Sequence, residues 1–449
     1  MNDSIFRLQF EMRQVFRLCF VTVLTLGGVL LASQNASQKA RADEPAPAEQ
    51  DVQLETLRKV WQTIDEVHWD RELIEEKWSG ILPEFEEKLS KTEDVDGARN
   101  VIQGMIDRLG QSHFGIIPSG IYKRQNELGI EKGSGTLGMQ IRLIDGELIV
   151  TRVSPESPAA EAGLQVGDRL DQIRSKSADE IIQKASESAE FKAGRAETYV
   201  GLIAEAMLGG SVGNKVSVHW TDGNDDSQQS DIVLGPSEGT FAEFGNLPAA
   251  EVVMKTKVLP GGVVYYHFSS FFNPVQLVTK MKTLMEEQSD SKGLILDVRG
   301  NRGGIVLLAC GISNWLTTEP TAIGIMKSKT SELKLRLNPR KPHFDGKVVV
   351  LIDELSISAA EILAGGLQDA TLATVIGSQS AGLVLPSIVS QLPNGDRFQY
   401  AISDFQTGEG RRLEGTGVTP DMVVPVSQES LRAEGDPVLK RALALIEGE

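Results

Sequence analysis

Cysteine is nearly absent from this sequence. Of the 449 residues only Cys19 and Cys310 are cysteines, and Cys19 lies in an apolar N-terminal stretch that we expect to be removed on export. One remaining cysteine excludes an intramolecular disulfide, which a chain of this length does not need. Cys310 lies in the apolar run IVLLACGI, so we predict a buried thiol and not a nucleophile. No cluster of His, Cys, Asp and Glu has metal-ligand spacing, so we expect no metal and no other cofactor.

Positive charge is also scarce. Lys and Arg number 45 against 62 Asp and Glu, which leaves a net charge of −17. Such a chain is repelled by phosphate backbones and by anionic lipid, so we exclude nucleic acid as a partner. The hydrophobic share of 41% is that of a globular protein, and the length predicts two or three domains.

Long apolar runs are absent outside the N-terminus. The stretch LCFVTVLTLGGVLLA at 18–32 follows three arginines and precedes the small residues Ala40-Arg41-Ala42. This order is typical of a secretory signal, so we predict a signal peptide at 1–42 and a periplasmic or extracellular protein. The stretch is shorter than the roughly 20 apolar residues of a membrane span, and an uncleaved N-terminal membrane anchor is the alternative.

The spacing of apolar residues and the local composition divide the remaining chain into segments. Residues 43–50 (DEPAPAEQ) predict a linker. From 51 to 128, apolar residues spaced by three and four predict a helical segment, which ends in GQSHFGIIPSG with Ser112 and His113. Residues 129–238 are rich in glycine with alternating apolar residues, a pattern typical of a small β domain.

Residues 239–430 alternate strand and helix patterns. Strands are predicted at 263–268, 293–298, 347–352 and 373–377, and helices at 274–287, 305–316 and 359–369. This order predicts an α/β domain with a mostly parallel sheet covered by helices. A C-terminal helix is expected within 431–449.

The stretch SISAAEILAG at 356–365 follows one of these strands. Ser358 and Glu361 form a capping-box pattern, which predicts the start of a helix. A strand that turns into a helix also presents a hydroxyl and backbone N–H groups to a reacting carbonyl. Ser358 is therefore either a helix cap alone or a cap that is also a nucleophile, and the stretch itself leaves both open.

The order of the segments resembles the carboxyl-terminal processing (tail-specific) proteases and the related tricorn core protease. GTLGMQI at 135–141 with SPAAEAGLQVGDRL at 157–170 resembles a PDZ domain. In such a domain an exposed loop offers N–H groups to a terminal carboxylate while the peptide adds to the sheet edge as a strand. The resemblance implies a crotonase-like α/β protease core and four substrate-binding residues, Thr136, Leu137, Gly138 and Met139.

LILDVRGNRGG at 294–304 and SISAAEILAGGLQDA at 356–370 resemble the family's glycine turn and nucleophile segment. The resemblance makes Ser358 the nucleophile. It makes the backbone N–H groups of Gly304 and Ala359 the oxyanion hole, two fixed donors for the charge of a tetrahedral intermediate.

The general base departs from the pattern of the processing proteases. They use a lysine at the end of a glycine-containing loop, and here that loop ends in Leu383, with no lysine between 347 and 440. The tricorn branch uses a histidine that follows a serine, together with a late glutamate. This implies His113 as the base, oriented by Ser112 and Glu414. Neighbouring residues of a regular strand face opposite sides, so Ser112 can orient His113 only if the chain bends there.

We therefore expect an exported serine endopeptidase with a histidine base, which hydrolyses unfolded or tagged protein chains through an acyl-enzyme and without a cofactor. Its partners would be protein or peptide substrates, with capture of their C-termini as one mode of binding. The alternative is a catalytically inactive PDZ-containing binding or scaffold protein derived from the protease fold, in which Ser358 only caps a helix.

Overall fold

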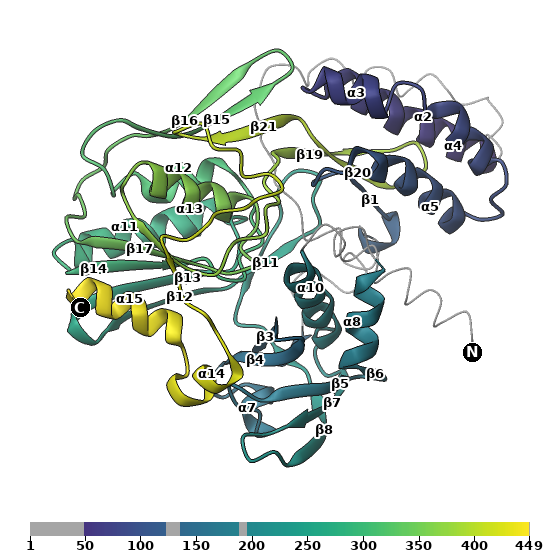
Figure 1. Cartoon of the computed structure of the whole chain (residues 1–449). Coiled ribbons are helices and arrows are strands. Elements are labelled where there is room, and N and C mark those ends of the chain that lie inside the picture. The colour runs from purple at the N-terminus through teal and green to yellow at the C-terminus, as the bar shows by residue number, and fades with distance from the viewer. Residues whose placement is uncertain (1–48, 123–134, 188–194, 449) are drawn as a thin grey trace.

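The structure is a computed structural model that describes residues 49–122, 135–187 and 195–448. This part of the chain forms an N-terminal helical layer, a small β domain and a larger α/β domain (Figure 1). The predicted signal at 1–42 lies outside the described residues. Within the described ranges, no helix has both the length and the apolar character that a membrane crossing requires.

The N-terminal layer consists of helices that pack on a small sheet. The helices are α2 (Glu49–Val67), α3 (Arg71–Lys77), α4 (Leu82–Leu89), α5 (Val95–Ile106) and the 3-10 turn η1 (Asp107–Leu109). The sheet joins β1 (Gly115–Ile117), β20 (Arg397–Ala401) and β19 (Ser387–Gln391), all antiparallel. Ile106, Ile116 and Phe398 share one apolar cluster, so segments from both ends of the chain form this layer. α2 begins at Glu49, inside the stretch expected to be a linker.

The small β domain is built on an antiparallel sheet of order β3-β4-β5-β7-β8. Its strands are β3 (Met139–Ile144), β4 (Glu147–Val153), β5 (Arg169–Ile173), β7 (Lys215–Thr221) and β8 (Ser227–Val233), with β6 (Lys176–Ser177) beside β5. The short strands β2 (Gly135–Thr136) and β9 (Gly235–Pro236) pair with each other. Its helices are α7 (Pro158–Glu161), α8 (Ala178–Ser186) and α10 (Ala196–Leu208). β3 is an edge strand, and α10 lies between this domain and the α/β domain (Figure 1).

The α/β domain contains a sheet of order β12-β13-β14-β17-β18-β22. Its strands are β12 (Met254–Leu259), β13 (Val263–Phe268), β14 (Gly293–Asp297), β17 (Lys347–Ile352), β18 (Thr374–Gly377) and β22 (Met422–Val423). Only the β12–β13 pair is antiparallel, so the predicted mostly parallel sheet is confirmed. Buried strand residues alternate between two apolar clusters, one on each face of the sheet.

Helices cover both faces of this sheet (Figure 1). One face carries α11 (Pro274–Gln288), α12 (Leu307–Ser313) and α13 (Ala359–Asp369), and the other carries α15 (Pro437–Glu447). The helix predicted at 305–316 is shorter than expected, whereas the one at 359–369 is confirmed. The expected single C-terminal helix is two, because Gly435 and Pro437 separate α15 from α14 (Gln428–Glu434).

Two further strand groups were not predicted. β15 (Thr321–Ser328) lies between β16 (Glu332–Leu337) and β21 (Ser403–Thr407), and β10 (Thr240–Ala242) pairs with β11 (Ala250–Val252). The 3-10 turn η3 (Pro260–Gly262) joins β12 to β13. The fold class predicted from the sequence, a helical segment, a small β domain and an α/β core, is confirmed.

Candidate active site

Three turns meet at one edge of the central sheet. β14, β17 and β18 are neighbours and run in parallel, so the segments that follow their carboxyl ends lie side by side. These segments are 298–304, 353–358 and 378–384. Ligand sites of parallel sheets lie beyond this edge of the strands, so the topology itself brings the predicted glycine turn, the predicted nucleophile and the loop that ends in Leu383 together.

Ser358 stands between β17 and α13 as the N-cap residue of the helix. Its backbone is strained, with φ of +59° and ψ of −115°, a region that residues other than glycine rarely adopt. Its N–H donates to Glu361 Oε2 over 2.9 Å, which is one half of the predicted capping box. The residue is 0% exposed, so a substrate reaches it only after the surroundings move.

The glycine turn lies directly against Ser358. A Cβ on Gly303 would come within 2.7 Å of the Ser358 Cβ, and one on Gly304 would come within 2.6 Å of the Phe271 backbone. Phe271 N–H donates to the Gly303 carbonyl, and Ile305 N–H donates to the Phe271 carbonyl. The Gly304 N–H takes no part in this pairing. The turn is tied to the segment of Ser358 by the Ile357 N–H, which donates to the Asn301 carbonyl over 2.9 Å.

Ser112, His113 and Glu414 form one hydrogen-bonded set. Ser112 Oγ lies 2.7 Å from His113 Nδ1 and donates to Glu414 Oε2 over 2.9 Å, while Ser112 N–H donates to Glu414 Oε1 over 3.0 Å. The bend that this set requires is at His113 itself, whose φ is +61°, and Gly110 adds a left-handed turn before it. The structure therefore brings together these three residues from opposite ends of the chain.

The hydrogen bonds determine the tautomer of His113. Ser112 Oγ has one proton and donates it to Glu414, so His113 Nδ1–H donates to Ser112 Oγ and Nε2 is the unprotonated nitrogen. Burial lowers the pKa of His113 to about 3, which keeps the ring neutral. Burial also raises the pKa of Glu414, although the N–H groups of Val384 and Ser112 oppose the rise. A neutral ring with an unprotonated Nε2 is the form in which histidine accepts a proton.

His68 supports this set and carried no signal in the sequence beyond its helical surroundings. Its Nδ1 accepts the Asp70 N–H, so its Nε2–H donates to Gln111 Oε1 over 2.7 Å. Its ring stacks on Phe114 with centroids 5.9 Å apart. His68 therefore holds the residues on both sides of the Ser112-His113 pair.

Leu383 contributes its backbone and not its side chain. The side chain is 4% exposed and belongs to an apolar cluster with Leu355, Ile357 and core residues of the small β domain such as Leu137. Its N–H donates to Glu361 Oε2 over 3.0 Å. The position that resembles the lysine of the processing proteases is therefore part of a hydrophobic contact between domains.

The predicted PDZ loop is less open than expected. Leu137 is 2% exposed and its carbonyl accepts the Ala159 N–H, while Thr136 and Met139 are half-buried. Gly138 N–H donates to Thr136 Oγ1 over 2.9 Å. The expectation of an exposed loop was wrong, because the Leu137 side chain packs into the core of the small domain.

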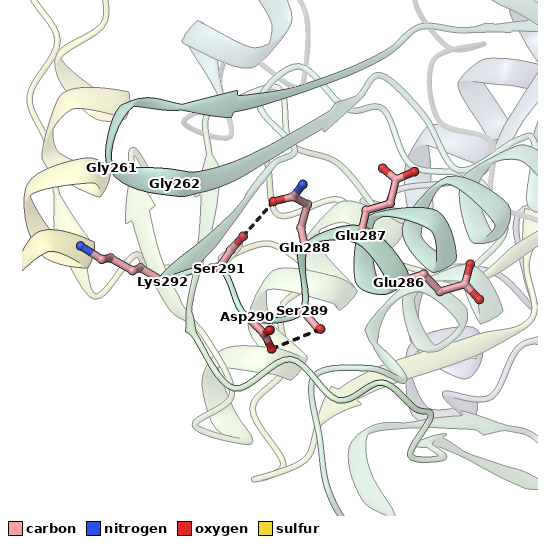
Figure 2. Close-up of a pocket in the computed structure, with 9 residues that line it drawn as sticks. All are labelled: Gly261, Gly262, Glu286, Glu287, Gln288, Ser289, Asp290, Ser291 and Lys292. Atoms are coloured by element: carbon pink, nitrogen blue, oxygen red, sulfur yellow. Dashed lines mark hydrogen bonds between the residues drawn. The ribbon is translucent and has the colours of Figure 1, made fainter.

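A polar depression on the α/β domain lies away from this site. Figure 2 shows its lining by Gly261, Gly262 and residues 286–292, with Glu286 and Lys292 extending outward. These residues precede β13 and β14, so they mark the amino edge of the sheet. Ser358 follows the opposite, carboxyl edge, and the depression contributes nothing to the site.

Comparisons with known proteins identify the families that two parts of the chain match. A model of peptidase family S41 matches residues 262–424, and a PDZ domain model matches residues 149–186. The carboxy-terminal processing protease CtpB of Bacillus subtilis is 25% identical over 371 residues, which cover 82% of this chain and 70% of that protein. The chloroplastic carboxyl-terminal-processing peptidase 3 of Arabidopsis thaliana is 23% identical over 404 residues, covering 88% and 73%.

Two solved structures share the fold. The photosystem II D1 C-terminal processing protease superposes with a TM-score of 0.56 at 17% identity, covering 86% of this chain and 96% of that one. Mature CPAF complexed with lactacystin superposes with a TM-score of 0.57 at 14% identity, covering 89% and 99%. The chain therefore contains a peptidase family S41 domain and a PDZ domain, and its curated homologues are carboxy-terminal processing proteases.

Proposed function

We propose that the chain is an exported serine endopeptidase that hydrolyses unfolded or tagged protein chains with Ser358 as nucleophile and His113 as general base. The hydrogen-bonded set of Ser112, His113 and Glu414 carries this proposal. It supplies an unprotonated imidazole nitrogen as the base, which the side chain of Leu383 cannot do. A protease domain joined to a PDZ domain implies protein or peptide substrates.

The chemistry follows from the groups present. Ser358 Oγ attacks the scissile carbonyl carbon while His113 Nε2 takes the hydroxyl proton, and Glu414 stabilises the imidazolium through Ser112. The N–H groups of Gly304 and Ala359 donate to the developing oxyanion. His113 then returns the proton to the leaving amine as the C–N bond breaks, which leaves an acyl-enzyme. Water deprotonated by His113 hydrolyses this ester and restores Ser358.

The PDZ domain would deliver the substrate. β3 is an edge strand of its sheet within the described residues, so an extended peptide can add to it as a further strand. The loop of Thr136, Leu137, Gly138 and Met139 leads into β3, where a terminal carboxylate would lie. Because Gly138 N–H is bonded to Thr136 Oγ1, that hydroxyl must turn away for this N–H to receive a carboxylate.

A binding or scaffold protein is the second candidate. Two observations favour it, the 0% exposure of Ser358 and the apolar surroundings of Leu383. In this version Ser358 only begins α13, and the PDZ domain is the functional part.

Cleavage of an unfolded protein by residues 43–449 distinguishes the serine endopeptidase from the binding or scaffold protein. We expect the wild type to cut, and Ser358→Ala and His113→Ala to lower kcat by about 10³-fold or more. His219→Ala, in strand β7 of the PDZ domain, is the matched control and should cut like the wild type. Activity equal to wild type in either site variant would remove that residue from the mechanism. An inert wild type that gains activity only as Leu383→Lys would be a disabled relative of the lysine-type enzymes.

A further inference from the structure

Glu361 is fully buried in the first turn of α13, and its carboxylate accepts hydrogen bonds at both oxygens. Oε2 accepts the N–H groups of Ser358 and Leu383, and Oε1 accepts Ser380 Oγ–H over 2.6 Å and Gly382 N–H over 2.7 Å. A capping box explains only the bond to Ser358. The other donors come from the loop after β18, so the carboxylate joins the nucleophile turn to that loop.

The same loop is held from a second direction by Glu414. Val384 N–H donates to Glu414 Oε2 over 2.9 Å, one residue after the Leu383 N–H that donates to Glu361. Consecutive N–H groups of an extended chain point to opposite sides, as those of Leu383 and Val384 do. Gly382, with φ of +69°, is not extended, and its N–H also donates to Glu361. The backbone at 382–384 is therefore a spacer with Glu361 and Ser358 on one side and Glu414, with its bonded pair Ser112 and His113, on the other.

The loop that carries Glu414 is fixed by the same contacts. Ser380 Oγ, which donates to Glu361, accepts the Val418 N–H over 2.6 Å, and the Gly415 N–H donates to the Gly382 carbonyl over 2.8 Å. A Cβ on Gly382 would come within 2.9 Å of the Gly417 nitrogen. The spacer therefore has little freedom to shift while Glu361 holds it.

We propose that Glu361 is a positioning residue, which sets the place of Ser358 relative to His113 by holding the backbone at 382–384 as a rigid spacer. The inference deepens the proposed function and rests on it for its catalytic consequence. Leu383, which stands where the processing proteases have their lysine, then acts through its backbone N–H. The buried carboxylate of Glu361 holds that N–H in place.

The test compares Glu361→Gln with Glu180→Gln in the full chain. Glu180 forms a capping box with Ser177 on α8, with an exposed carboxylate and none of the loop contacts. In Glu361→Gln the new side-chain amide would place its own N–H atoms against N–H donors. Since a displacement of about 1 Å can cost about 100-fold in rate, we expect kcat on an unfolded protein to fall by about that factor with KM changed less than about threefold. Glu180→Gln should match the wild type.

Two more measurements distinguish positioning from damage to the fold. Ser380→Ala removes one donor to the carboxylate, together with the acceptor of the Val418 N–H, and keeps the carboxylate itself. We therefore expect a smaller fall in kcat, about tenfold, at unchanged KM. Amide hydrogen exchange across 380–384 should quicken in Glu361→Gln and in Ser380→Ala, and should stay unchanged in Glu180→Gln.

The outcomes separate the two proposals. An active wild type with unchanged kcat in Ser380→Ala and in a folded Glu361→Gln overturns the positioning role and leaves the proposed function intact. An inert wild type counts against the proposed function. In that case the exchange data still decide, because unchanged exchange at 380–384 in the two variants would show that Glu361 does not hold the loop.

Discussion

Burial determines the charge of the ionisable residues around Ser358. His113 is 3% exposed, and burial lowers its pKa to about 3. Glu361 is 0% exposed, and burial raises its pKa to about 7 even though Ser380 and three N–H groups favour its ionised form. Both shifts favour the neutral side chain. The shift of His113 lowers the stability of the fold as the pH falls, whereas the shift of Glu361 lowers it as the pH rises.

The pKa values of His113 in the folded and unfolded chain determine how its contribution to stability changes with pH. In the unfolded chain the ring titrates near its ordinary value of 6.5, well above the folded value of about 3. Between these values the unfolded state binds more protons, so stability falls as the pH falls. We expect the stability advantage of the wild type over His113→Gln to shrink by about 1–2 kcal/mol between pH 6.5 and pH 5. Urea unfolding at both pH values measures it, and an advantage independent of pH would contradict the burial of a neutral ring.

At the scale of elements, the proposed active site depends on a glycine turn that lies against Ser358. Gly303 has φ of +83° and lies against the Ser358 Cβ. Gly213, in a turn of the PDZ domain, has φ of +86° and no atom near the place of a Cβ. The two positions have a similar positive φ and differ in crowding.

Alanine at these two positions should therefore distinguish the cost of a positive φ from the displacement of Ser358. Gly213→Ala should cost about 1–2 kcal/mol of stability from its backbone alone and leave cleavage unchanged. Gly303→Ala should cost more, and should lower kcat/KM by about 100-fold because Ser358 must shift. Thermal unfolding and the cleavage assay together measure this. Equal activity in both variants would mean that the turn yields without moving the nucleophile.

The elements themselves were largely predictable, because hydrophobic periodicity specifies them locally. The helix at 359–369 and the strand at 347–352 were predicted with the bounds that the structure has. β15 was missed because its buried residues do not alternate regularly, and β21 because it buries the polar residues Ser403, Asp404 and Thr407. β16 was missed although its residues alternate between exposed and more buried positions. Glu361 was recognised as a cap, but its bonds to 380–383 depend on a loop that the sequence leaves unplaced. His68 was missed for the same reason, because its partner Gln111 lies 43 residues away.

At the scale of the whole molecule, a buried arginine joins the small β domain to the α/β domain. Arg142 on β3 is 5% exposed, and its guanidinium contacts Asp353 and Glu205 over 2.6 Å and Glu354 over 3.2 Å. Asp353 also accepts the Gly300 N–H of the glycine turn. The edge strand β3 is thus connected by one side chain to the turns that hold Gly300 and Asp353 beside Ser358.

Replacement of Arg142 should lower the free energy of unfolding far more than replacement of an arginine at the surface. Arg142→Met leaves Asp353 and Glu354 without this cation in a largely buried site, while Glu205 keeps its pair with Arg302, and we expect a loss of about 3–5 kcal/mol. Arg169→Met, which loses half-exposed pairs with Glu147 and Asp171, should cost no more than about 1 kcal/mol. Urea denaturation compares the two variants, and similar losses would mean that the Arg142 network stabilises little.

In the proposed protease, the closed surroundings of Ser358 make the described conformation an inactive one. Only the fraction of molecules that is open at a given moment can bind and cut, so the apparent affinity for a substrate is reduced by that fraction. Each tenfold change in the fraction corresponds to about 1.4 kcal/mol, which is comparable to a single hydrogen bond. Contacts far from the nucleophile could therefore raise or silence activity over orders of magnitude while every catalytic residue stays the same.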